Sequence, residues 1–261
     1  MQFKWTLLGI VVLYLTCVSS VVWSAETLHF SGYDWSVKTG FMGPGPNHWD
    51  TANALVDKQG RLHLKLTQHD GQWYGAEVTL LSRLGFGHYE WQIASRLDQW
   101  DDNVVLGLFN YPTPDVGADG TNEIDIEFAR WGRAQNPLGN YTVWPPQAHT
   151  PPGTHTFEVR WKDVATTHRF DWLPQSVAFA SHPLQGAAEA GAAQHDDAEA
   201  KPPESRESSV EQFIFEPLTP QRSIPQNPLP VHFNLWLFRG QPPKNGQEVE
   251  VIISSFRFTP V

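Results

Sequence analysis

Apolar residues recur at every second position in several short segments of this chain, and clusters of Gly, Pro, Asn and Asp separate the segments. Side chains of a β-strand point alternately to its two faces, so this period is typical of half-buried strands. No segment before residue 180 has a convincing helical period. The pattern predicts an all-β sandwich or jelly roll, with strands in residues 62–66, 87–93, 156–161, 231–236 and 249–258. Residues 104–109 are nearly all apolar and predict a further strand that is buried on both sides.

The first 25 residues have the features of a signal peptide. Lys4 supplies a positive charge, residues 5–18 are mostly apolar, and Ser24 and Ala25 are small residues suited to cleavage. We therefore expect residues 1–25 to export the protein, which would be secreted or periplasmic. An uncleaved membrane anchor is the alternative, because residues 5–23 are nearly long enough to span a bilayer.

Residues 26–261 are predicted to form one domain with an insertion at residues 185–210. The insertion is rich in Ala, Glu, Gln, Ser and Pro and has no aromatic residue, so it cannot bury enough apolar surface to offset the entropy of ordering. We expect it to be disordered. A linker between two domains is the alternative, but the roughly 50 residues that follow are few for a separate core.

Composition narrows the class of partner. The net charge is -10, which argues against nucleic acid and anionic membranes, because both attract basic proteins. We expect a monomer that binds a neutral partner and contacts no membrane beyond the possible N-terminal anchor. The only cysteine is Cys17, so the mature chain would have no disulfide or thiolate metal site. The twelve Trp residues fit either a Trp-rich core or a groove that stacks sugar rings.

Three acids alternate with apolar residues between positions 123 and 128. Glu123, Asp125 and Glu127 would share one face of a strand, and the other face would carry Ile124, Ile126 and Phe128. Like charges on one face repel each other, so such a strand needs a functional reason, such as catalysis or metal binding. An exposed acidic edge strand and a calcium site are the alternatives, although calcium ligands usually come from a curled loop.

The spacing of the two glutamates suits retaining glycoside hydrolysis. Residues four apart on a strand are roughly 13 Å apart at Cα. Inclined Glu side chains could bring their carboxyl groups to the separation of about 5–5.5 Å that this chemistry requires. One carboxylate then attacks the anomeric carbon while the other group protonates the leaving oxygen. Asp125 lies between them and can tune their protonation.

The sequence Glu123-Ile124-Asp125-Ile126-Glu127-Phe128 resembles the active-site strand of glycoside hydrolase family 16 in its unbulged form. The family includes lichenases, laminarinases, agarases, carrageenases and xyloglucan transglycosylases. The resemblance implies a β-jelly-roll sandwich of two antiparallel sheets with a concave substrate cleft. It also implies retaining cleavage of a β-linked polysaccharide without a cofactor or metal. By the same match, Glu123 is the nucleophile, Asp125 its helper and Glu127 the acid/base.

Weaker similarities to the family occur in the family's order and imply substrate-binding residues. Segments 74–77, 109–111 and 233–236 resemble those that place sugar-binding side chains. Trp131 and Trp144 are candidates for additional stacking surface or for the core. The expected substrate-binding set is Glu77, Tyr111, Trp131, Asn140, Asn234 and Trp236.

The chain departs from lichenases at three positions near these motifs. Thr121 and Asn122 stand where lichenases carry Trp-Asp, and Thr79 stands where an arginine follows the sugar-binding glutamate. These departures leave the glycan open, although a β-glucan fits a neutral substrate best. A transglycosylase and a non-catalytic carbohydrate-binding sandwich remain as alternative functions.

Overall fold

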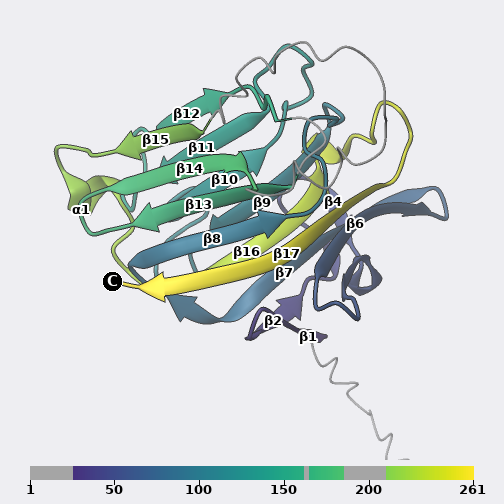
Figure 1. The fold of residues 1–261 in the computed structure, drawn as a ribbon, viewed down its shortest axis with the longest axis horizontal. Helices are drawn as coiled ribbons and strands as arrows, with labels where there is room; N and C mark the ends of the chain where they lie inside the picture. The colour runs from purple at the N-terminus through teal and green to yellow at the C-terminus, as the bar shows by residue number, and fades with distance from the viewer. Residues whose placement is uncertain (1–25, 162–164, 185–209) are drawn as a thin grey trace, which may run out of the picture.

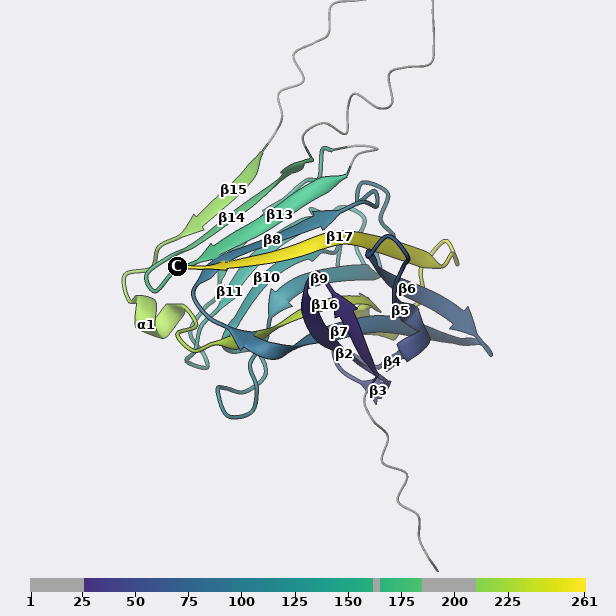
Figure 2. The ribbon, with the colours of Figure 1, turned by 60° about the horizontal axis from the view of Figure 1, so that its bottom comes forward.

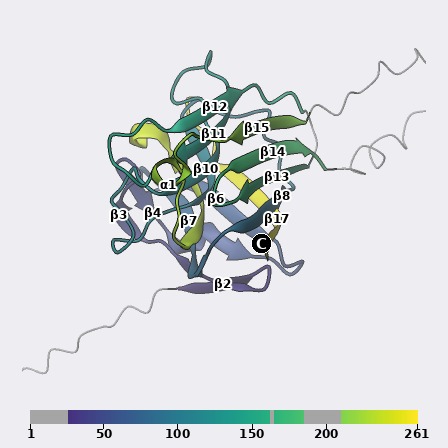
Figure 3. The ribbon, with the colours of Figure 1, turned by 90° about the vertical axis from the view of Figure 1, so that its left-hand side faces the viewer.

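The computed structural model describes residues 26–161, 165–184 and 210–261 (Figure 1). The predicted signal peptide and residues 185–209 of the predicted insertion lie outside the described residues. The chain forms two antiparallel β-sheets packed face to face, and Figures 2 and 3 show the two layers from other directions. The expected all-β jelly-roll sandwich is confirmed. Among the described residues, no helix is long and apolar enough to cross a membrane.

One layer, called here the front sheet, carries the acidic strand near its middle. Its eight strands follow one another in space in the order β1 (Thr27–Phe30), β2 (Tyr33–Val37), β7 (Gln72–Leu84), β16 (Leu229–Leu237), β9 (Val104–Asn110), β10 (Glu123–Phe128), β11 (Gly139–Trp144) and β12 (Gly153–Phe157). Segments far apart in sequence therefore become neighbours around β10.

The other layer, the back sheet, packs behind the front sheet. Its order is β5 (Ala54–Val56), β6 (Leu62–His69), β17 (Val249–Pro260), β8 (Gly87–Ile93), β13 (Thr166–Trp172), β14 (Val177–Pro183) and β15 (Glu211–Phe215). The end of β6 also pairs with the start of β7, which links the layers. The remaining elements are short and are β3 (Gly40–Met42), β4 (Asn47–Trp49), η1 (Thr51–Asn53), α1 (Pro220–Ser223) and η2 (Phe238–Gly240).

The period-two segments are strands, with one difference at residues 156–161. The strand β12 ends at Phe157, so residues 158–161 are not part of it. The strand ends there because its hydrogen-bonding partner, β11, begins at Gly139, which lies directly opposite Phe157. Beyond that point no strand among the described residues pairs with β12. Trp161 is still buried and its ring contacts that of Phe157, which explains why the apolar alternation continues past the strand.

Most of the Trp residues in the described chain serve packing. Trp35, Trp91 and Trp172 are fully buried between the two sheets, where they contact other aromatic rings. Trp49 and Trp236 belong to a smaller apolar cluster that also contains Val105 and Ala129. The core explanation of the Trp surplus therefore holds for Trp35, Trp49, Trp91 and Trp172. Trp236 packs in the smaller cluster but also lines the pocket described below, and Trp131 and Trp144 are only partly buried near the acidic strand.

A neutral histidine is buried between the sheets. His168 on β13 has no exposed surface, and its two ring nitrogens form hydrogen bonds with Thr166 Oγ1 at 2.7 Å and Ser181 Oγ at 2.8 Å. Its ring also contacts Phe128, the last residue of β10. Burial lowers the pKa of His168 to about 3, so the folded protein holds this imidazole uncharged near neutral pH.

Candidate active site

The acidic strand β10 is an inner strand of the front sheet, with a paired strand on each edge. It pairs with β9 on one edge and with β11 on the other, and the register places Glu123 opposite Trp144 and Glu127 opposite Asn140. Ile124, Ile126 and Phe128 have no exposed surface and point into the core. The three acids are therefore on the outward face of the front sheet, as the alternation predicts.

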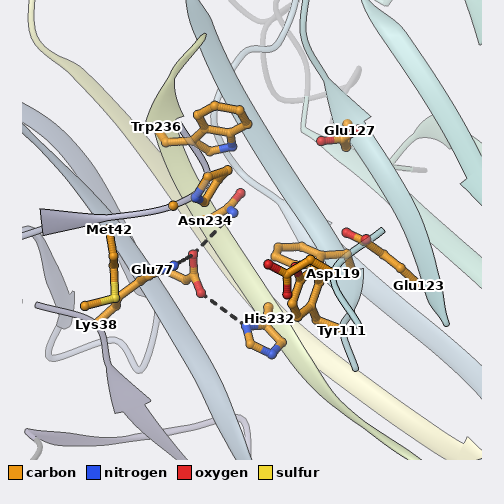
Figure 4. Close-up of a pocket in the computed structure, with 13 residues that line it drawn as sticks. Lys38, Met42, Glu77, Tyr111, Asp119, Glu123, Glu127, His232, Asn234 and Trp236 are labelled. Carbon is orange, nitrogen blue, oxygen red and sulfur yellow. Dashed lines mark hydrogen bonds and ion pairs between the residues drawn. The ribbon is translucent and has the colours of Figure 1, made fainter. Parts of the chain in front are cut away.

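A pocket of about 370 Å³ lies on this face. Figure 4 shows Glu123 and Glu127 on one side of it and Glu77, His232 and Asn234 on the other. Asp125 lies between the two glutamates on the same face of β10, but it is only 3% exposed and does not line the pocket. The remaining lining residues are Lys38, Met42, Gly43, Pro44, Phe109, Tyr111, Asp119 and Trp236.

The three acids have raised pKa values. Burial, followed by the charge of Glu127, raises the pKa of Glu123 to about 8, while interaction with Asp125 acts in the opposite direction. The pKa of Asp125 is raised well above its ordinary value by burial and by Glu123. Burial and the charge of Asp125 likewise raise the pKa of Glu127. Such a cluster retains protons near neutral pH, which a general acid needs.

Glu77 differs from the three acids, because Lys38 and two polar side chains lie within hydrogen-bonding distance of its carboxylate. Its carboxylate accepts from Lys38 Nζ at 2.8 Å and Asn234 Nδ2 at 3.4 Å, and His232 Nδ1 lies 3.2 Å from the other oxygen. Burial would raise the pKa of Glu77. The hydrogen bond and charge of His232, together with Lys38, outweigh burial and hold this pKa below its ordinary value. An ionised Glu77 therefore holds three pocket side chains in place.

We expect Lys38→Met to destabilise the fold by about 1–3 kcal/mol, because it removes a charged partner from a buried carboxylate. The Lys38 and Glu77 side chains are only 19% and 7% exposed. Denaturant unfolding at pH 7 measures the loss. Lys65→Met is the matched control, because Lys65 pairs with a half-exposed Glu250 at 3.6 Å and should change stability by less than about 1 kcal/mol. Equal losses in the two variants would contradict the role given to Lys38.

The structure separates the six expected substrate-binding residues into two groups. Glu77, Tyr111, Asn234 and Trp236 line the pocket. Trp131 and Asn140 do not line it. The Asn140 amide donates to two backbone carbonyls, Ala129 O and Leu138 O, and its oxygen lies 3.4 Å from Trp131 Nε1. Its hydrogen-bonding groups are thus used by the protein itself, at the turn after β10.

Other pocket residues were missed by sequence reasoning. Two of them, Phe109 and His232, could have been predicted from the sequence. They lie two residues before Tyr111 and Asn234, so the strand alternation places them on the same faces. No sequence pattern indicated Lys38, Met42 and Asp119. They reach the pocket from the end of β2, from β3 and from the loop before β10. Within the described parts of the chain, no group of three or more His, Cys, Asp or Glu side chains could hold a metal ion.

No family model matches the sequence, and no curated protein sequence matches it. Solved structures do. A β-glucanase of Bacillus licheniformis is 18% identical with a TM-score of 0.60, and the match covers 87% of this chain and 92% of that one. The fold is that of the family 16 glycoside hydrolases. A lichenase from a mouse hindgut metagenome is 16% identical (TM-score 0.61, 92% and 100% covered), and a family 16 endo-glucanase from Bacteroides ovatus is 15% identical (TM-score 0.60, 86% and 94% covered).

Proposed function

We propose that this protein is an exported, retaining endo-β-glycanase that cleaves a neutral β-linked polysaccharide of the β-glucan class. The observation that carries the proposal is the pair Glu123 and Glu127, which line one pocket on the outward face of the front sheet above a buried Asp125. The structural neighbours that are glucanases by name support the substrate class. The signal-like residues 1–25 support export.

The proposed reaction has two steps. In the first, the Glu123 carboxylate attacks the anomeric carbon, and the glycosidic oxygen leaves with a proton from Glu127. This step forms a glycosyl ester on Glu123 and leaves Glu127 ionised. In the second, Glu127 takes a proton from water, the water oxygen attacks the anomeric carbon, and the ester bond to Glu123 breaks. Glu127 is then protonated again, so the enzyme returns to its starting state.

The raised pKa of Glu127 fits the acid/base role, whereas the raised pKa of Glu123 means that a nucleophilic carboxylate there depends on Asp125. Glu127 must begin protonated, and burial with the neighbouring Asp125 charge raises its pKa. Glu123 must begin ionised, and its interaction with Asp125 works against the rise that burial causes. A protonated Asp125 that donates a hydrogen bond to Glu123, without transferring its proton, would favour the ionised, nucleophilic form of Glu123.

A glycan panel tests the function. The mature protein would be incubated with β-1,3-, β-1,4- and mixed-linkage glucans, xyloglucan and agarose, and new reducing ends would be measured. Release from at least one neutral β-glycan is expected. Binding without release would identify a carbohydrate-binding sandwich. Longer products without a matching gain in reducing ends would identify a transglycosylase.

We expect the first product of hydrolysis to be the β-anomer. Double displacement at one carbon inverts it twice, so the configuration of the β-linked substrate is retained. Proton NMR in the first minutes, before mutarotation, measures the anomer directly. An initial α-anomer would overturn the double-displacement mechanism even if both glutamates proved essential.

A further inference from the structure

Trp144 donates a hydrogen bond into the acid cluster. Its indole Nε1 donates to Asp125 Oδ2 at 2.8 Å, and Trp144 is also the residue directly opposite Glu123 in the β10–β11 ladder. Asp125 is 3% exposed, so little water competes for this interaction. Hydrogen bonds to ionisable groups are strong in such surroundings. Trp144 is thus a hydrogen-bond donor to Asp125 and the β-ladder partner of Glu123.

The second oxygen of Asp125 has a different environment. Oδ1 is buried, and no N–H or O–H group in the described parts of the chain donates to it. The Asp125 and Glu123 carboxyl groups influence each other's protonation, since Glu123 raises the pKa of Asp125 and a hydrogen bond with Asp125 lowers that of Glu123. Because a carboxyl group is planar, anchoring Oδ2 also sets the direction of Oδ1. The Trp144 bond therefore leaves Oδ1 as the oxygen that can carry a proton toward Glu123.

We propose that Trp144 is a positioning residue for the nucleophile. Its indole anchors Oδ2 of Asp125, so that Oδ1 carries a proton toward Glu123 while Glu123 attacks as a carboxylate. The kinetic part of this inference rests on the proposed function. The hydrogen bond itself belongs to the free protein and can be tested without substrate.

The first experiment follows indole N–H resonances by ¹⁵N–¹H NMR as a function of pH. The Trp144 resonance is the one that disappears in Trp144→Phe. It should shift as the acid cluster titrates, and this shift should vanish in Asp125→Asn. A Trp144 chemical shift that does not change with pH would overturn the proposal, and so would a shift that changes by the same amount in Asp125→Asn. Either result is independent of whether the protein cleaves a glycan.

The second experiment is a double-mutant cycle with the best substrate of the glycan panel. Trp144→Phe keeps an aromatic ring and removes the donor, so it should lower kcat roughly tenfold, as expected for the loss of one buried hydrogen bond, with a smaller change in KM. In an Asp125→Ala background, where the indole N–H has no side-chain acceptor at position 125, the same change should alter kcat less than about twofold.

Trp100→Phe is the matched control, since Trp100 Nε1 donates to Val104 O at the same 2.8 Å outside the pocket. It should leave kcat unchanged. A Trp144→Phe effect confined to KM and equal in both backgrounds would make Trp144 a sugar-stacking residue and overturn the positioning role. Wild-type turnover in the same assay tests the proposed function separately.

Discussion

Glu123→Gln and Glu127→Gln should each lower kcat by at least about 10²-fold while leaving the fold intact. A general acid or base alone typically contributes about 10²–10⁴-fold, and loss of a nucleophile removes the covalent route entirely. Both side chains line the pocket and neither belongs to the apolar core. Turnover and circular dichroism measured on the same samples separate catalysis from folding.

The same substitutions should raise stability at alkaline pH. Burial raises the pKa values of both glutamates above the ordinary 4.5, that of Glu123 to about 8. A raised folded-state pKa contributes stability that is present below the unfolded pKa and is lost as the pH rises through the folded pKa. Wild type therefore carries a penalty that grows between about pH 4.5 and 8, and glutamine carries none.

We expect the melting temperature of Glu127→Gln to exceed that of wild type at pH 8, and the difference to shrink by pH 5. Glu158→Gln is a control, because Glu158 is half-exposed and lies outside the pocket. It should change neither turnover nor the pH dependence of melting. A Glu123 or Glu127 variant that kept more than about a tenth of wild-type turnover would remove that residue from its assigned role.

Acid should destabilise the protein through His168. Its pKa falls from 6.5 to about 3 on folding, so the folded state holds it neutral while the unfolded chain protonates it. The stability it contributes is fully present above about pH 6.5 and is lost as the pH falls toward 3. The loss is about 1.4 kcal/mol per pH unit, on the order of 5 kcal/mol across the window.

His168→Gln should remove this contribution to the pH dependence. The free energy of unfolding would be measured by denaturant titration at several pH values from 7 to 4. The amide can still interact with the Thr166 and Ser181 hydroxyls that bond His168 in wild type, so the variant should remain folded. Other groups, including Glu77, give both proteins a shared acid dependence.

The control is His29→Gln, whose side chain is 69% exposed and pairs only with a surface aspartate. Its unfolding free energy should follow wild type across the whole range. If the unfolding free energy of His168→Gln changed with pH as steeply as that of wild type, the imidazole would not be held neutral by the fold.

The period-two alternation determined the strands, because each face of a strand meets one environment over its whole length. It placed β8 and β10 at their observed bounds and brought Glu123, Asp125 and Glu127 to one face. It overextended β12, since pairing depends on where β11 begins, and no local pattern records that. The alternation likewise could not tell whether a Trp belonged to the core or the pocket.

The amino-acid sequence by itself determined the fold class and the acidic face, because both follow from residues close together in the chain. Only the tertiary structure decided what surrounds those acids. Lys38 and His232 reach Glu77 across 39 and 155 positions, and Trp144 reaches Asp125 across 19. These contacts form because β2, β7 and β16, and then β10 and β11, become neighbours in the front sheet. Burial then sets the charges of the site, and burial is a property of the packed sheets.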